Sequence, residues 1–166
     1  DQMVLTVGYD IENLTDPARR ARYHGAIEKD PYGRELPKQA HGSINLDGHT
    51  SSTRKIMCAV SELFDRIVDK NLLVRRMYVV ANHVLPEADA PKKNDGAVQL
   101  DLFTDYAAEE EKQKAEDAAL ERERKIQKAA LAIKKKYGKN AILKAMNLEE
   151  GATAKDRNAQ IGGHKA

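Results

Sequence analysis

The chain has 166 residues and a mass of 18.5 kDa, which fits one domain of ordinary size with an appendage. The net charge is only +2, but acids cluster at 109–123 and bases at 19–38, 54–76 and 124–144, so local basic patches are what would attract a polyanion. The lone Cys58 excludes an internal disulfide, and without a membrane-length apolar run or a signal-peptide pattern we expect a cytoplasmic protein with no membrane partner.

The first part of the chain predicts two strands separated by a long connection. Residues 3–10 alternate between apolar and smaller side chains, as a strand with a buried face does. Residues 11–40 lose this periodicity and collect Pro and Gly, so we expect loops and turns. Bases outnumber acids there, which fits either a solvated loop or a basic segment beside a nucleic acid. A weaker strand is predicted at 40–46, followed by a turn at Asp47-Gly48.

The best-defined element is a helix from about Ser51 to Val68, followed by a third strand. Apolar residues recur through the helix at helical spacing, and Cys58 among them is expected to pack in the core. The third strand, 72–85, has apolar residues on both faces, which predicts a central place in the sheet. Its even-numbered face holds Val74, Arg76, Tyr78, Val80 and Asn82.

The remainder of the chain is predicted to be mostly helical and charged. Pro86 ends the third strand, and 87–98 reads as a flexible spacer. Residues 105–137 contain no Gly or Pro and favour a long helix whose narrow apolar stripe packs on one partner surface. A short helical turn is expected at 140–146, and the last eighteen residues are expected to be disordered. The stripe consists of Ile126, Ala130, Ile133 and Tyr137.

These elements predict an α+β fold: an incomplete antiparallel sheet with a packed helix, then a long charged helix and a flexible tail. The expected divisions are a domain at 1–86, a linker with a binding motif at 87–104, and a helical tail at 105–166.

The linker contains a short apolar run, Gln99-Leu100-Asp101-Leu102-Phe103, in otherwise polar surroundings. Exposed apolar side chains in such a setting commonly become buried by a partner, and an extended segment binds with alternate side chains in pockets. The alternative is the start of a helix, or a strand docked on its own domain. The pattern resembles the pentapeptide by which bacterial DNA polymerases and repair proteins dock on the sliding clamp.

A second candidate site is the N-terminus of the predicted helix at 51–68. Four consecutive hydroxyl residues, 50–53, precede the bases Arg54 and Lys55. Unpaired N–H groups, hydroxyls and a guanidinium together suit a phosphate, although a plain helix cap with surface bases would give the same sequence.

Catalytic and metal sites are not predicted. His41 and His49 lack a further ligand at metal-binding spacing, and Asp10 with Glu12 is the only near pair of carboxylates in the folded part. The sequence also has no phosphate-binding loop of the Walker type. No active site or cofactor is therefore expected in this chain.

Several blocks together resemble the little-finger region of Y-family translesion DNA polymerases, in the ImpB/MucB/SamB branch of SOS repair polymerases from Gram-positive bacteria. The resemblance covers nearly the whole chain. Its blocks are the strand at 2–10, Tyr23-His24-Gly25, Tyr32-Gly33-Arg34, Lys38-Gln39-Ala40-His41-Gly42, Thr50-Ser51-Ser52-Thr53-Arg54, Leu63-Phe64-Asp65, the strand from Val74-Arg75-Arg76 to Ala81-Asn82-His83-Val84, and the tail from Tyr137-Gly138 to Ile161-Gly162-Gly163-His164.

The resemblance implies a DNA-binding sheet with helices on one face and a clamp-binding motif after it. The implied clamp contacts are Gln99, Leu100, Asp101, Leu102 and Phe103, with the Gln making polar contacts and the Leu and Leu-Phe side chains entering pockets. The implied phosphate contacts are Lys38, His41, Ser51, Ser52, Thr53 and Arg54. Such contacts hold DNA without sequence preference.

The family's palm, with its magnesium-binding carboxylates, and its fingers and thumb have no counterpart here. The first strand and helix of the little finger would precede Asp1, so we expect a piece of a longer polypeptide that is inactive as a polymerase alone. Two other interpretations stay open: a stand-alone adaptor that recruits a protein through its long helix, and a nonfunctional truncated remnant.

Overall fold

The computed structural model describes residues 1–91, 106–161 and 164–165. It divides into two compact units, residues 1–99 and 100–166, which are described separately. The fold class is α+β, as predicted: a small antiparallel sheet with a packed helix in the first unit and a long helix in the second.

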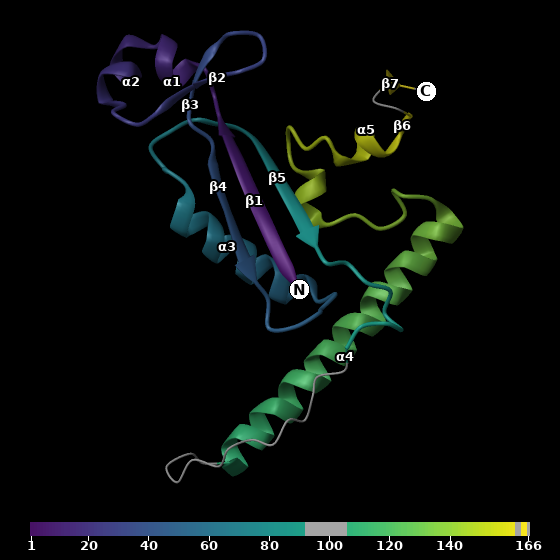
Figure 1. The fold of residues 1–166 in the computed structure, drawn as a ribbon. Helices are drawn as coiled ribbons and strands as arrows, with labels where there is room; N and C mark the ends of the chain where they lie inside the picture. The colour runs from purple at the N-terminus through teal and green to yellow at the C-terminus, as the bar shows by residue number, and fades with distance from the viewer. Residues whose placement is uncertain (92–105, 162–163, 166) are drawn as a thin grey trace. The chain divides into compact units, whose positions relative to one another are not determined.

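The sheet of the first unit has three antiparallel strands with β1 in the centre (Figure 1). The order is β4 (Ala40–Asn45), β1 (Gln2–Tyr9) and β5 (Val74–Asn82). The alternation in β1 places Met3, Leu5, Val7 and Tyr9 in the core. The predicted strands are therefore confirmed: β1 begins and ends one residue earlier than its pattern suggests, and β4 and β5 are shorter than theirs.

The prediction of a central place for β5 is wrong, because β5 lies at the edge of the sheet. Its only neighbour among the described strands is β1, and every residue from Val74 to Ala81 is exposed. Val79 and Val80 are 52% and 50% exposed. Apolar residues on both faces of this strand therefore do not indicate burial on both faces. The central place belongs to β1.

Helix α3 (Thr53–Ile67) covers one face of β4 and β1 and completes the core. Leu63 is fully buried and forms a cluster with Leu5, Val7, Tyr9 and Val68. Close packing depends on Gly42, since a Cβ there would lie 3.2 Å from Leu63 Cδ1 and 3.2 Å from Ile67 Cγ2. The predicted helix is confirmed, but Cys58 is exposed on its solvent side.

The connection between β1 and β4 contains regular structure where the sequence predicts loops. It holds α1 (Glu12–Thr15), α2 (Pro17–Arg22) and a hairpin of β2 (Ile27–Lys29) with β3 (Glu35–Pro37). Local polar contacts fix these short elements: the Asp16 carboxylate accepts a hydrogen bond from the Arg19 N–H at 2.8 Å, and Asp30 caps the hairpin turn. Elements this short and exposed leave no apolar periodicity to detect.

The second unit begins with α4 (Tyr106–Tyr137), which confirms the predicted long helix and contains no buried residue. A 3₁₀ turn at Ala145–Leu148 replaces the helical turn expected at 140–146. The tail contains α5 (Ala154–Asn158) and the strand pair β6 (Gln160–Ile161) and β7 (His164–Lys165), where disorder was expected. Asn140 fixes α5, because its Oδ1 accepts a hydrogen bond from Asn158 Nδ2 at 2.7 Å. None of the described helices is long and apolar enough to cross a bilayer.

Candidate nucleic-acid interface

The register of the sheet defines a face that α3 does not cover, which we name the open face. Residues directly opposite one another in antiparallel strands point to the same side, and Leu5 and Gly42 point toward α3. Their neighbours in each strand therefore point away from α3. The open face consists of Gln2, Val4, Thr6 and Gly8 on β1, His41, Ser43 and Asn45 on β4, and Arg76, Tyr78, Val80 and Asn82 on β5.

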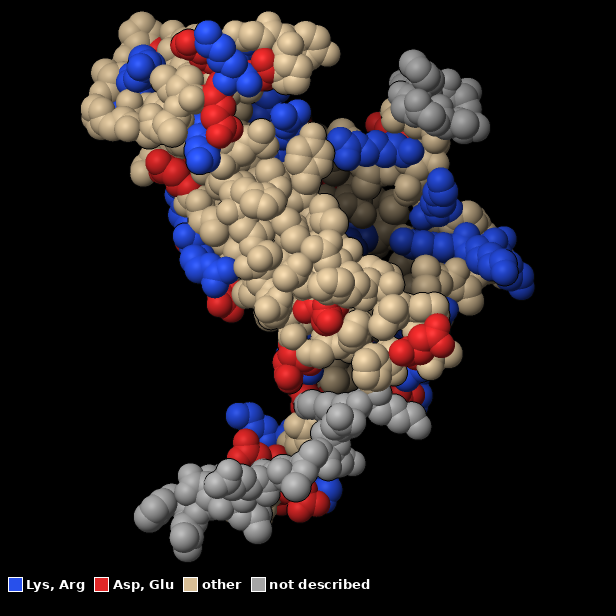
Figure 2. Space-filling view, in the orientation of Figure 1, with Lys and Arg blue, Asp and Glu red and all other residues tan. Residues whose placement is uncertain are grey.

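The open face contains no Asp or Glu among these eleven residues, and most of its side chains are hydroxyls, amides or small apolar groups. Figure 2 shows the surface over β4 and β1 as mostly uncharged. A polyanion approaching this face would meet hydrogen-bonding groups and one arginine without repulsion from a carboxylate. The electrostatic attraction between a polyanion and the open face would be modest, because few of the contacts carry charge.

Side-chain hydrogen bonds join the open face into rows that cross the strands. Gln2 Nε2 donates to Asn45 Oδ1 at 2.9 Å, and Gln2 Oε1 accepts from Asn82 Nδ2 at 2.8 Å. In a second row Thr6 Oγ1 and His41 Nδ1 lie 2.9 Å apart. These contacts order the polar side chains before any ligand arrives, which lowers the entropy lost on binding.

Arg76 and Tyr78 form the charged and aromatic part of the open face. The Arg76 guanidinium carbon lies 5.5 Å from the centroid of the Tyr78 ring. The arginine side chain lies against Gly8, where a Cβ would approach its Cγ to 3.0 Å. Tyr78 retains 51% of its exposure. The sequence places both residues on one face of β5, but only the register shows that Gly8, Thr6 and His41 accompany them.

The six predicted phosphate contacts fall into two separate groups. His41 lies on the open face, and Lys38 is exposed just before β4, where its backbone N–H donates to the Ala26 carbonyl at 2.8 Å. Ser51, Ser52, Thr53 and Arg54 lie at the start of α3, in the layer behind the sheet. The structure therefore does not gather them into one surface.

The start of α3 is capped as its hydroxyl-rich sequence predicts. The Ser52 hydroxyl oxygen accepts a hydrogen bond from the Lys55 N–H at 3.3 Å, and Thr50 Oγ1 accepts from the Ser52 N–H at 3.1 Å. Ser52 is 6% exposed, so its hydroxyl serves the cap rather than the surface. Ser51, Thr53 and Arg54 are exposed, and their contact with phosphate stays a prediction.

Two histidines flank Asp1 on the side of the sheet opposite to the open face. His83 Nδ1 lies 2.7 Å from Asp1 Oδ1, and His49 Nε2 lies 3.6 Å from Asp1 Oδ2. His83 has a left-handed backbone, with φ at 53°, which ends β5. In the described part of the chain, no group of three or more potential ligands is arranged to hold a metal ion.

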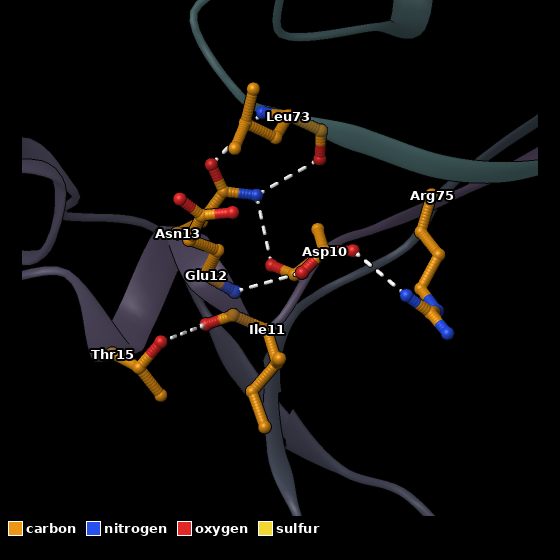
Figure 3. A network of polar contacts seen from close by, with 7 residues as sticks. All are labelled: Asp10, Ile11, Glu12, Asn13, Thr15, Leu73 and Arg75. Carbon is orange, nitrogen blue, oxygen red and sulfur yellow. Dashed lines mark hydrogen bonds and ion pairs between the residues drawn. The ribbon is translucent and has the colours of Figure 1, made fainter.

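A buried asparagine, which no local sequence pattern marks, joins the end of β1 to the start of β5 (Figure 3). Asn13 is 1% exposed, and its Nδ2 donates to the carbonyls of Asp10 and Leu73, both at 2.9 Å. Its Oδ1 accepts from the Leu73 N–H at 2.9 Å. This side chain thus fixes where β5 begins, and with it the position of the Arg76 and Tyr78 backbone.

The Asp10 carboxylate completes this network. Its Oδ1 accepts a hydrogen bond from the Glu12 N–H at 3.0 Å, and its Oδ2 accepts one from Arg75 Nη1 at 3.1 Å. The Glu12 N–H, and then Arg75, lower the pKa of Asp10 below its ordinary value. Arg75 lies at the register shift between β1 and β5, so the ion pair holds the extra residue of that bulge in place.

The predicted clamp-binding pentapeptide, residues 99–103, lies outside the described residues. Its partner is therefore a matter for binding experiments.

Comparisons of the chain with models of protein families, with curated proteins and with solved structures gave no match.

Proposed function

We propose that this chain is the C-terminal part of a cytoplasmic translesion DNA polymerase. It would contact the sugar–phosphate backbone of DNA and dock on the sliding clamp. The observation that supports this most directly is the open face, a sheet surface with ordered hydrogen-bonding groups, an exposed Arg–Tyr pair and no carboxylate. The sequence resemblance supplies the polymerase and clamp parts of the proposal.

Contacts of this kind suit a protein that must bind any sequence. Hydroxyl and amide side chains, together with arginine, are the groups that contact phosphate and sugar oxygens in protein–DNA complexes. Such contacts position the protein without reading bases. Because the open face has few full charges, we expect weak binding to DNA, and the clamp would then supply the local concentration that a polymerase needs.

The start of α3 offers a second region of phosphate contact. Ser51, Thr53 and Arg54 are exposed beside a helix N-terminus, which carries partial positive charge. Because this region lies in the layer behind the open face, it would contact a different stretch of backbone from the one that His41 and Arg76 contact.

A protein-interaction adaptor is the second candidate function, favoured by α4. This helix has 32 residues and none is buried, while Ile126 and Tyr137 on its apolar stripe are 60% and 67% exposed. A helix with these properties packs on a partner or stands in solvent. An adaptor would have no affinity for DNA.

Salt dependence of DNA binding separates the two candidates. For the DNA-binding function, fluorescence anisotropy with a labelled primer–template should show an affinity that falls measurably between low and physiological salt, because the phosphates bound by Lys and Arg release counterions; the slope should be small, since few contacts are charged. The double variant Lys38→Gln/Arg54→Gln should bind more weakly at every salt concentration and lower the slope by about one for each lost contact. The matched control is Lys70→Gln, since Lys70 is paired with Asp65 at 2.6 Å. Absence of binding would favour the adaptor, whereas binding that salt does not weaken would contradict the proposed phosphate contacts.

Clamp docking is tested by calorimetry with a purified bacterial sliding clamp. The full chain should bind saturably, and Leu102→Ala/Phe103→Ala should weaken binding by about 100-fold or more, because the two side chains that fill pockets are lost. Thr104→Ala is the control, since this residue follows the pentapeptide and is not among the expected clamp contacts, and it should retain affinity within about threefold. Equal affinities for all three proteins would refute the pocket assignment.

A further inference from the structure

We propose that the Tyr78 ring is a stacking site for an unpaired nucleobase, so that the open face binds single-stranded DNA in preference to duplex. This inference rests on the proposed DNA-binding function and specifies which form of DNA the open face takes. It concerns three residues in contact on two strands, namely Gly8, Arg76 and Tyr78.

The register places Tyr78 in a row of side chains that crosses all three strands. Tyr78 lies directly opposite Thr6, which lies directly opposite His41, so the three side chains form one row across β5, β1 and β4. The next rows on either side are Arg76 with Gly8, and Val80 with Val4 and Ser43. Apart from Arg76, the neighbours in these rows are small, and the ring is 51% exposed.

Arginine beside the ring suits a nucleotide rather than an apolar ligand. Gly8 leaves room for the Arg76 side chain, and the guanidinium lies 5.5 Å from the ring centroid. A base stacked on the ring would therefore have its own phosphate within the reach of a cation. Aromatic side chains beside basic groups on an exposed sheet are the arrangement that single-strand-binding domains use.

The chemistry of stacking favours a single strand over a duplex. Each base of a duplex is already stacked on its neighbours and paired, so stacking it on Tyr78 would require its extrusion from the helix. An unpaired base has a free face, and stacking on an aromatic side chain contributes about 1–3 kcal/mol per base. We therefore assign the ring to unpaired template bases.

A second tyrosine–arginine pair in the chain serves as a matched control. Tyr32 is 84% exposed at the turn between β2 and β3, and the Arg34 guanidinium carbon lies 5.3 Å from its ring centroid. Arg34, however, forms an ion pair with Asp30: its Nε and Nη2 atoms each lie 2.7 Å from Asp30 Oδ2. Its charge is neutralised beside the ring, and the hairpin that carries the pair has two strands where the open face has three.

The experiment uses the absence of tryptophan from the chain. Tyr78→Trp and Tyr32→Trp each introduce a single fluorescent reporter, and each full-length protein is titrated with a short single-stranded oligonucleotide and with the duplex of the same sequence. The emission of Tyr78→Trp should be quenched by the single strand and changed little by the duplex. The emission of Tyr32→Trp should change little with either.

Affinity provides the second measurement. Tyr78→Ala should weaken single-strand binding by about 5- to 150-fold, corresponding to the stacking of one base, whereas Tyr78→Phe should stay within about twofold of the unmodified chain. Duplex affinity should change by less than about twofold in both. Gly8→Ala, which forces Arg76 from its place, should also weaken single-strand binding. Circular dichroism checks that each variant is folded. If Tyr78→Ala is unfolded, Tyr78→Phe and Tyr78→Trp test the stacking site instead.

Each contrary outcome has a distinct meaning. Binding of DNA without quenching of Tyr78→Trp and without a Tyr78→Ala effect would overturn the stacking site and leave the proposed function intact. Equal losses for single strand and duplex would overturn the preference. No binding of either DNA by the unmodified chain would overturn the proposed function, and the stacking site with it.

Discussion

Leu63→Ala is expected to lower the free energy of unfolding of the first unit by about 3 kcal/mol. Leu63 is fully buried where α3 packs on β1 and β4, and its δ-methyl group lies against Gly42. Removing it leaves a cavity between the helix and the sheet. The core is small, with Met3, Leu5, Val7, Tyr9, Leu63 and Val68 as its buried apolar residues in the described part of the chain, so this loss would be a large fraction of the unit's stability.

The measurement is denaturation by urea followed through near-UV circular dichroism of tyrosine, because Tyr9 is buried in this core whereas far-UV signals come largely from α4. The control is Met57→Ala on the same helix, where the side chain is 58% exposed and the change should stay within about 0.5 kcal/mol. Similar losses in the two variants would show that α3 does not pack on the sheet through Leu63.

Asn13→Asp is expected to lower the free energy of unfolding by about 3 kcal/mol at neutral pH, although the two side chains have nearly the same shape. The Asn13 Nδ2 group donates to the carbonyls of Asp10 and Leu73, and a carboxylate at this buried site has no hydrogen to give them. Two carbonyl oxygens would then face a negative charge. The acceptor for the Leu73 N–H would remain.

The pH dependence of the Asn13→Asp variant gives a sharper readout than its stability alone. Burial among carbonyl oxygens raises the pKa of the new carboxyl in the folded state above its unfolded value. The penalty is therefore largest above the folded-state pKa, shrinks as pH falls through that value, and reaches its minimum below the unfolded-state pKa. The deficit relative to the unmodified chain should therefore shrink between pH 7 and pH 4. Asn71→Asp, at an exposed position in the loop between α3 and β5, should cost less than about 1 kcal/mol. A deficit that is independent of pH would contradict the proposed hydrogen bonding.

Local periodicity was sufficient to predict the strands and helices that contribute to the core. The alternation around Leu5 and the helical spacing around Leu63 each reflect burial of one face, which leaves a direct trace in the sequence. The same reasoning failed for β5, because apolar residues on both faces of a strand do not reveal how many neighbours the strand has. It also failed for the hairpin of β2 and β3, whose few residues are fixed by Asp30.

The candidate site was only partly predictable for a related reason. Because side chains alternate along a strand, the sequence alone showed that Arg76 and Tyr78 share a face of β5. His41 was expected to contact phosphate because of the family resemblance. What joins them is the register of β1 with both neighbours, which depends on contacts between residues far apart in the chain. Asn13 is the extreme case, since its partner Leu73 lies 60 positions away and no local pattern marks the pair.

The order of the strands also governs how the chain can fold. The central strand β1 precedes both of its neighbours in the chain, but its pairing with β5 joins Gln2 to Asn82, whereas its pairing with β4 joins Gln2 to Asn45. Closing the larger loop costs more chain entropy, and contacts between such distant residues slow folding. During synthesis β1 can pair with β4 and receive α3 while β5 is still being made. The open face, with Tyr78 and Arg76 on β5, is therefore complete only once β5 has been made and has paired with β1.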